Sequence, residues 1–173
     1  MPFTVALIAL IFTALGVWVS TLQRPASPAV VSNPTQLFFQ SEFPETASGM
    51  QKMAQWQGKP LIINFWASWC PPCIREMPEL SAFSQQARKH GIEVIGIGVD
   101  SREHVTEFAK AHPVAYPLYI ADIAGTELSR QLGNETGGLP FTVLIGSDGK
   151  IKKTYLGILN FSQLNQDIQQ VLK

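Results

Sequence analysis

The only two cysteines of this 173-residue chain, Cys70 and Cys73, are separated by two residues. They stand where a continuous apolar run ends and a helical pattern begins. A Cys-x-x-Cys pair at a strand-to-helix junction is typical of a redox-active dithiol. Because two cysteines cannot build a disulfide scaffold, the fold must be stabilised by packing instead.

The apolar run before the cysteines covers residues 61–67. It is short and β-branched at its start, which favours a buried central strand over a helix. After the pair, apolar residues recur at helical spacing as far as Gly91, at Ile74, Met77, Leu80, Phe83 and Ala87. Pro78 falls inside this predicted helix, and we expect it to kink the helix.

Downstream, strands and helices alternate. Strands are predicted at 92–99, 118–121, 141–146 and 150–156, and helices at 102–111, 124–132 and from Asn160 onward. An Asp-Gly turn at 148–149 joins the last two strands into a hairpin. Upstream of residue 61, a short strand is predicted at 37–43 and a helix at 50–57. The alternation predicts an α/β fold with a mostly parallel central sheet, helices on both faces and antiparallel strands on one side.

The amino-terminal segment is of a different kind. Residues 3–22 carry no charge, and a helix of this length can cross about 30 Å of hydrocarbon. We therefore expect a membrane anchor over residues 1–23, a cleavable signal peptide being the alternative. Residues 24–36 are rich in Pro, Ser and Ala and are predicted to form a linker. The folded domain is expected over residues 37–173.

The composition argues against one class of partner. The formal net charge is zero, and no basic cluster is visible along the chain. Nucleic acid binding is therefore not expected, because it depends on a basic surface.

The chemistry of the pair follows from its place before a helix. The unpaired N–H groups and the dipole at a helix start favour a thiolate at Cys70. Cys70 would attack a substrate disulfide, and Cys73 would release the product by closing the Cys70–Cys73 bond. Pro71 and Pro72 lack N–H donors, so we expect a moderately lowered thiol pKa and a reducing couple.

Three alternatives to a redox dithiol are less favoured. A structural disulfide in so tight a loop would contribute little chain entropy. A zinc site needs two further ligands, and His90, His104 and His112 show no partner spacing. A peroxide-reducing thiol needs an activating environment, usually a Thr and an Arg, and no Thr lies near Cys70. No metal ion and no cofactor is expected.

The motif at residues 65–73, FWASWCPPC, resembles the active site of the thioredoxin superfamily. Pro78 matches the kink proline of that family. Leu139 and Pro140, followed by Phe-Thr-Val, resemble the strand that the family opens with a cis-proline, which lies against the dithiol and binds substrate backbone. The resemblance covers roughly residues 35–173 and implies a thioredoxin-like fold with a central mixed sheet flanked by helices.

The apolar amino-terminal run, Asn64 and Glu76 narrow the resemblance to the TlpA/ResA/DsbE-like branch. That branch implies a single-pass protein of the bacterial inner membrane with its catalytic domain in the periplasm or otherwise outside the cytoplasm. It also implies protein disulfide substrates, with apocytochrome c as a candidate, and a membrane thiol reductase as electron donor. The alternatives are a thiol oxidase or isomerase of exported proteins and a non-catalytic binding or chaperone module.

The resemblance also implies roles for individual residues. Asn64 and Gly96 stand where thioredoxins carry a buried Asp and a Lys, which leaves Glu76 to act as proton partner and to modulate the thiol pKa. The alternative is a solvated Glu76 in the first turns of a helix. Pro140 could also simply open an edge strand. The residues expected to contact substrate are Trp69, Pro71, Pro72, Leu139 and Pro140.

Overall fold

The structure is a computed structural model in which residues 34–171 are described. The predicted anchor at 1–23 and residues 24–33 of the predicted linker lie outside the described residues. Across 34–171, no helix combines the length and the apolarity that crossing a membrane requires.

A seven-stranded sheet forms the centre of the described domain, in the order β2-β1-β5-β4-β3-β6-β7. Strands β3, β4 and β5 are parallel, whereas β6 runs antiparallel to β3, and β7 to β6. At the other edge β1 is antiparallel to both β5 and β2. The strands are β1 (Glu42–Glu45), β2 (Gly49–Lys52), β3 (Leu61–Trp66), β4 (Glu93–Gly98), β5 (Leu118–Ile120), β6 (Phe141–Ile145) and β7 (Ile151–Leu156).

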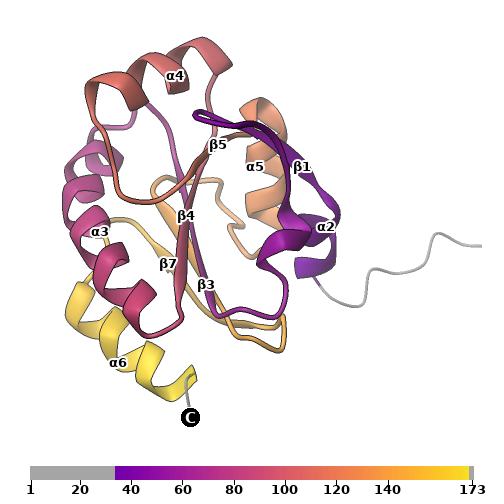
Figure 1. The fold of residues 1–173 in the computed structure, drawn as a ribbon, viewed down its shortest axis with the longest axis vertical. Helices are drawn as coiled ribbons and strands as arrows, with labels where there is room; N and C mark the ends of the chain where they lie inside the picture. Colours follow the sequence, from indigo (N-terminus) through magenta and orange to yellow (C-terminus); the bar gives the residue numbers. More distant parts are fainter. Residues whose placement is uncertain (1–33, 172–173) are drawn as a thin grey trace, which may run out of the picture. The chain divides into compact units, whose positions relative to one another are not determined.

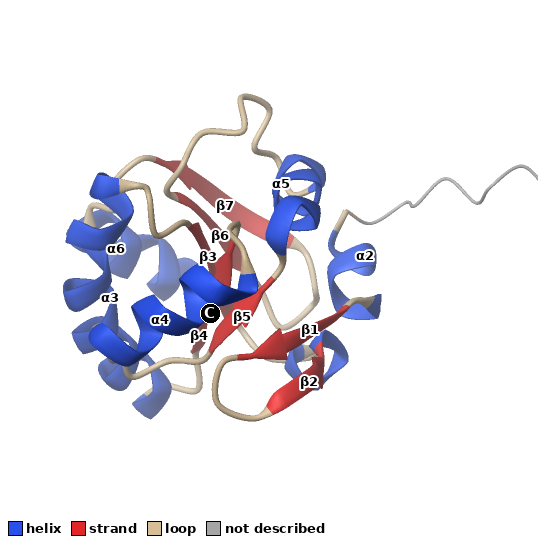
Figure 2. Ribbon diagram, turned by 90° about the horizontal axis from the view of Figure 1, so that it is seen from above, coloured by secondary structure: helices blue, strands red, loops and turns tan. Residues whose placement is uncertain are grey.

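Helices cover both faces of this sheet (Figures 1 and 2). One face carries α3 (Pro71–Lys89), α4 (Arg102–Ala111) and α6 (Phe161–Val171). The other carries α2 (Thr35–Gln40) and α5 (Asp122–Gln131). The predicted element order from residue 61 onward, with a mixed central sheet between two helical layers, is therefore confirmed. The expectation of a mostly parallel sheet with antiparallel strands on one side only is wrong, because β1 and β2 add antiparallel pairs at the edge opposite β6 and β7.

Strand β3 lies between β4 and β6, and all six of its side chains are buried. Successive side chains of a strand point to opposite faces. Ile62 and Trp66 accordingly enter the core under α3, while Ile63 and Phe65 enter the core under α2 and α5. This double burial explains why the strand reads as a continuous apolar run rather than an alternating one.

The topology brings the chemistry to one edge of the sheet. The parallel strands β3, β4 and β5 end at Trp66, Gly98 and Ile120, which lie in register at their carboxyl ends. Strand β6 runs the other way, so its first residue, Phe141, pairs with Phe65 near the end of β3. The turn that carries the cysteines and the segment before β6 therefore lie at the same end of the sheet, next to the carboxyl end of β3.

Two predicted elements near the start of the domain are wrong. Residues 37–40 do not form a strand, because helix α2 covers Thr35–Gln40 and buries Phe38 and Phe39 against the sheet, and β1 starts only at Glu42. Residues 50–57 do not form an α-helix: β2 pairs with β1, and only a 3₁₀ turn, η1 (Met53–Trp56), follows. In both places pairing and burial against the completed sheet override local propensity.

Candidate active site

The turn that follows β3 places Cys70 immediately before the first residue of helix α3. Cys70 is the N-cap residue, with an extended backbone, and its N–H donates to the Ala67 carbonyl at 3.2 Å. Pro71 and Pro72 occupy the first helical positions, where an N–H would have no helical partner in any case. Pro78 lies inside α3, which continues without interruption to Lys89.

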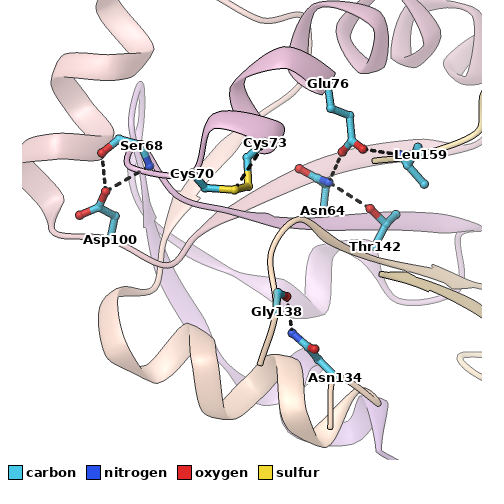
Figure 3. The surroundings of a disulfide bond; sticks show 10 residues. All are labelled: Asn64, Ser68, Cys70, Cys73, Glu76, Asp100, Asn134, Gly138, Thr142 and Leu159. Carbon is cyan, nitrogen blue, oxygen red and sulfur yellow. Dashed lines mark hydrogen bonds between the residues drawn. A yellow bond between two sulfur atoms is a disulfide. The ribbon is translucent and has the colours of Figure 1, made fainter. Parts of the chain in front are cut away.

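The two cysteines are joined in a disulfide bond, with their Cα atoms 5.3 Å apart. The backbone N–H of Cys73 donates to Cys70 Sγ at 3.3 Å (Figure 3). Both cysteines are buried, whereas the neighbouring Trp69 is 66% exposed and Pro71 is also exposed. An N–H aimed at Sγ from the first turn of a helix stabilises negative charge on that sulfur when the bond is reduced.

The peptide bond between Leu139 and Pro140 is cis, as the resemblance implied. Pro140 is buried immediately before β6, and its carbonyl accepts a hydrogen bond from the Gly157 N–H at 2.8 Å. The half-buried Leu139 packs against the core cluster that contains both cysteines. Because β6 is flanked by β3 and β7, the alternative that Pro140 opens an edge strand is wrong.

Glu76 is buried, with only 2% of its surface exposed, so the alternative of a solvated glutamate is wrong. Its Oε1 accepts a hydrogen bond from Asn64 Nδ2 at 2.8 Å, and its Oε2 accepts one from the Leu159 N–H at 2.5 Å. The second hydrogen of Asn64 Nδ2 goes to Thr142 Oγ1 at 3.0 Å. Figure 3 shows the Glu76 carboxyl pointing from α3 toward Asn64 on β3, which in turn contacts Thr142 on β6.

Burial raises the pKa of Glu76, and the hydrogen bonds from Leu159 and Asn64 offset only part of that increase. A buried carboxyl with a raised pKa takes up a proton more readily near neutral pH than a solvated one does. Glu76 lies one helical turn after Cys73, so a titratable group stands close to the dithiol on the same helix.

Gly96 pairs with Asn64 across β3 and β4, at the position where thioredoxins carry a Lys. A Cβ on Gly96 would lie 2.6 Å from Leu118 Cδ2 and 3.2 Å from the ring atoms of Trp66 and Tyr116. The space beside Asn64 is thus filled by aromatic rings and leaves no room for a lysine side chain. Asn64 is instead hydrogen-bonded to the buried Glu76 carboxyl on the neighbouring helix α3.

The sequence reasoning missed one contact to the active-site turn. Ser101 caps α4 by accepting the His104 N–H at 3.2 Å. In addition, Asp100 Oδ2 accepts hydrogen bonds from both the N–H and the hydroxyl of Ser68. These residues are 32 positions apart, so no local pattern could have predicted the contact.

Within residues 34–171, no group of three or more His, Cys, Asp or Glu side chains is arranged to hold a metal ion.

A protein-family model described as Redoxin matches residues 38–168 of the chain. The thiol-disulfide oxidoreductase ResA of Geobacillus thermodenitrificans is 29% identical over 123 residues, which cover 69% of this chain and 67% of that protein. The thiol:disulfide interchange protein DsbE of Pseudomonas aeruginosa is 29% identical over 163 residues, covering 92% of this chain and 84% of that protein.

Solved structures show the same fold. A thioredoxin-family thiol:disulfide interchange protein of Chlorobium tepidum superposes with a TM-score of 0.64 at 24% identity, covering 77% of this chain and 93% of that one. StoA of Bacillus subtilis superposes with a TM-score of 0.58 at 22% identity, covering 75% and 97%. The described domain therefore has a thioredoxin-like fold.

The matched family, the ResA and DsbE relatives and the Cys70–Cys73 pair at the start of α3 agree with one another. The chain belongs to the Redoxin family and is a thiol–disulfide oxidoreductase of the TlpA/ResA/DsbE-like kind.

Proposed function

We propose that this oxidoreductase works as a reductant of disulfides in exported proteins, with Cys70 as the nucleophile and Cys73 as the resolving thiol. The observation that carries the proposal is the Cys73 N–H, which points at Cys70 Sγ from the first turn of a 19-residue helix. This donor selects Cys70 as the sulfur that carries the negative charge. Pro71 and Pro72 add no further N–H, so the thiolate is stabilised only moderately, as suits a reductant.

The reaction proceeds in two exchanges. The Cys70 thiolate attacks one sulfur of the substrate disulfide, which forms a mixed disulfide and releases the other substrate sulfur as a thiolate. Cys73 then loses its proton and attacks Cys70 Sγ, which closes the Cys70–Cys73 bond and releases the second substrate sulfur. Two electrons pass from the dithiol to the substrate, and the substrate thiolates take up the protons.

Glu76 is the proton partner in this scheme. Its raised pKa and its place one turn after Cys73 suit it to accept the Cys73 proton as that thiol becomes a nucleophile. The hydrogen bonds from Asn64 and Leu159 hold the carboxyl in position. Protonation of the neighbouring carboxyl also removes a negative charge that would oppose a second thiolate.

The substrate contacts the surface around the disulfide. Trp69 and Pro71 are exposed beside Cys70, and Leu139 is half-buried in the segment that carries the cis-proline. Pro72 is partly exposed in the same first turn of α3. These apolar groups suit an extended polypeptide segment whose disulfide lies over Cys70, with Pro140 beneath its backbone.

The cellular setting of the proposal rests on the sequence and on the family. The uncharged residues 3–22 would anchor the chain in the bacterial inner membrane, with the catalytic domain in the periplasm or otherwise outside the cytoplasm. That compartment is oxidising, so a reductant there must be re-reduced by a membrane thiol reductase. Apocytochrome c, whose haem-binding thiols must be reduced, is the candidate substrate.

Trapping tests the proposal. Cys73→Ala should accumulate mixed disulfides through Cys70, and mass spectrometry of the captured proteins identifies the substrates. The matched control is the Cys70→Ala/Cys73→Ala double variant, which should capture none. Equal capture by the control would exclude Cys70 as the nucleophile, and a function that survives Cys70→Ser would indicate a binding or chaperone module. A pair that oxidises glutathione readily would favour a thiol oxidase or isomerase.

A further inference from the structure

The turn that carries Cys70 is held by the side chain of Asp100, which lies between the end of β4 and α4. Residues 67–70 connect the end of β3 to α3, and Ser68 lies in the middle of this turn. The backbone N–H of Ser68 donates to Asp100 Oδ2 at 3.2 Å, and its hydroxyl donates to the same oxygen at 2.5 Å. Two bonds to one carboxylate oxygen fix both the backbone and the side chain of Ser68.

Asp100 is itself held from the other side. Its Oδ1 accepts hydrogen bonds from the Ser101 N–H at 2.8 Å and from His104 Nδ1 at 2.9 Å. The Asp100 carboxylate thus joins three segments, namely the turn before Cys70, the end of β4 and the first turn of α4. Figure 3 shows the Ser68–Asp100 pair on the opposite side of the disulfide from Asn64 and Glu76.

The carboxylate remains charged at neutral pH. Burial raises the pKa of Asp100, but hydrogen bonds from Ser68, His104 and Ser101 outweigh it and hold the pKa below its ordinary value. Hydrogen bonds to a charged acceptor are stronger than those between neutral groups. A buried carboxylate with four donors is therefore a firm anchor for the turn.

We propose that Asp100 is a positioning residue for the dithiol, which acts through Ser68 to hold Cys70 within bonding reach of Cys73. This inference rests on the proposed exchange chemistry of the pair. Reaction between two groups on one chain depends on their effective concentration, which falls steeply when either group is free to move. The turn held by Asp100 keeps Cys70 at the Cα separation that the disulfide requires, 5.3 Å.

The direction of the effect follows from entropy. The disulfide bond already restricts Cys70, whereas the dithiol form has no covalent restraint between the two sulfurs. Holding the turn therefore removes more freedom from the dithiol than from the disulfide, and it favours the disulfide form. Loosening the turn should make the pair easier to reduce and thus a weaker reductant.

The test is the equilibrium with glutathione, in which the Cys70–Cys73 disulfide and two glutathione thiols exchange with the dithiol and glutathione disulfide. Ser68→Ala and Asp100→Asn should each shift this equilibrium about tenfold toward the dithiol, which corresponds to about 30 mV for a two-electron couple. The double variant should shift it no further than the larger single change, because both substitutions break the same contact.

Two control variants separate this effect from general loss of structure. Ser84→Ala removes a buried hydroxyl from α3, the helix that carries Cys73, where this hydroxyl donates to the Ser81 carbonyl. Asp148→Asn removes a carboxylate from the distant β6–β7 turn, where it binds Lys152. Both should keep the wild-type equilibrium. Should Asp100→Asn fail to fold, Ser68→Ala alone decides the matter, because it removes one hydroxyl donor and leaves the other three donors of Asp100 in place.

Three outcomes would contradict the positioning role of Asp100. If the wild type exchanges with glutathione and both variants have the wild-type equilibrium constant, this inference is overturned and the proposed function is unaffected. A shift in Asp100→Asn without one in Ser68→Ala would assign the effect to charge and overturn the positioning role. A wild-type pair that does not exchange at all would overturn both proposals.

Discussion

The side-chain amide of Asn64 donates one hydrogen to Glu76 Oε1 at 2.8 Å and the other to Thr142 Oγ1 at 3.0 Å. A single nitrogen thereby joins helix α3 to the two central strands β3 and β6. In a buried setting each of these groups needs its partner, because an unpaired buried polar group is costly. The cluster therefore fixes the helix that carries Cys73 and places a titratable carboxyl beside it.

The first prediction concerns stability as a function of pH. The folded-state pKa of Glu76 is raised, so between the ordinary glutamate pKa and the raised one the native state binds more protons than the unfolded state. The free energy of unfolding of the wild type should therefore fall, through this group, as pH rises across that window. Glu76→Gln should remove this fall, so the variant gains stability relative to the wild type as pH increases.

Urea unfolding from pH 4 to pH 8 measures this difference. The matched control is Glu127→Gln, because Glu127 is exposed on helix α5, which covers the other face of the sheet. Parallel stability curves for the wild type and Glu76→Gln would contradict the prediction. The same pair of variants tests the proton role, since only Glu76→Gln should alter the pH dependence of disulfide exchange.

The second prediction concerns Asn64. Asn64→Ala leaves Glu76 Oε1 and Thr142 Oγ1 without this donor, so we expect a loss of about 1–3 kcal/mol in the free energy of unfolding. It should also raise the pKa of Glu76 further, because a hydrogen bond that lowers the pKa is lost. Carbon-13 NMR of the Glu76 carboxyl measures the second effect. The exposed Asn165→Ala should change neither quantity, and an unchanged Glu76 pKa in Asn64→Ala would refute the assignment.

The third prediction concerns the close approach of β4 to its neighbours. Gly96→Ala puts a Cβ 2.6 Å from Leu118 Cδ2, so something must shift, and we expect a cost of about 1–3 kcal/mol. Leu118→Ala removes the clashing atom. The double variant should therefore lose less free energy of unfolding than the two single variants lose together. Thermal or urea unfolding measures this coupling. Additive costs would show that Leu118 is not the source of the strain.

The fourth prediction separates the two tryptophans near the pair. Trp69 is 66% exposed and Trp66 is fully buried. Trp69→Ala should leave the free energy of unfolding within about 0.5 kcal/mol of the wild type. It should also raise the KM for a protein disulfide, while exchange with glutathione changes little. Trp66→Ala should instead cost about 3–5 kcal/mol. Equal KM values for wild type and Trp69→Ala would exclude Trp69 from substrate binding.

Much of the site was predictable because its determinants are local. Cys70, Pro71, Pro72 and Cys73 are consecutive, and helix geometry alone places the second thiol one turn from the first. The resemblance supplied the cis bond before Pro140, which the structure contains. For Glu76 the sequence left two readings open, since spacing along a helix does not reveal which face is buried against polar partners.

The remaining contacts could not be predicted because they join distant parts of the chain. Thr142 and the Leu159 N–H reach Asn64 and Glu76 only after β6 and the segment before α6 have packed. Asp100 meets Ser68 only because β3 and β4 are parallel neighbours that end at the same edge. The early strand and helix predictions failed for the same reason, since residues 35–56 take their form from a sheet that is built elsewhere in the chain.

The sequence by itself determined the chemistry of this protein, because a dithiol at a helix start is a local arrangement of neighbouring residues. It also determined the order of elements from β3 to α6, because hydrophobic periodicity is a local signal. Only the tertiary structure decided the environment of the dithiol: the burial of Glu76, its link through Asn64 to Thr142, and the carboxylate that holds Ser68. These features depend on which distant backbone and side-chain groups meet, and that is fixed by strand order and packing.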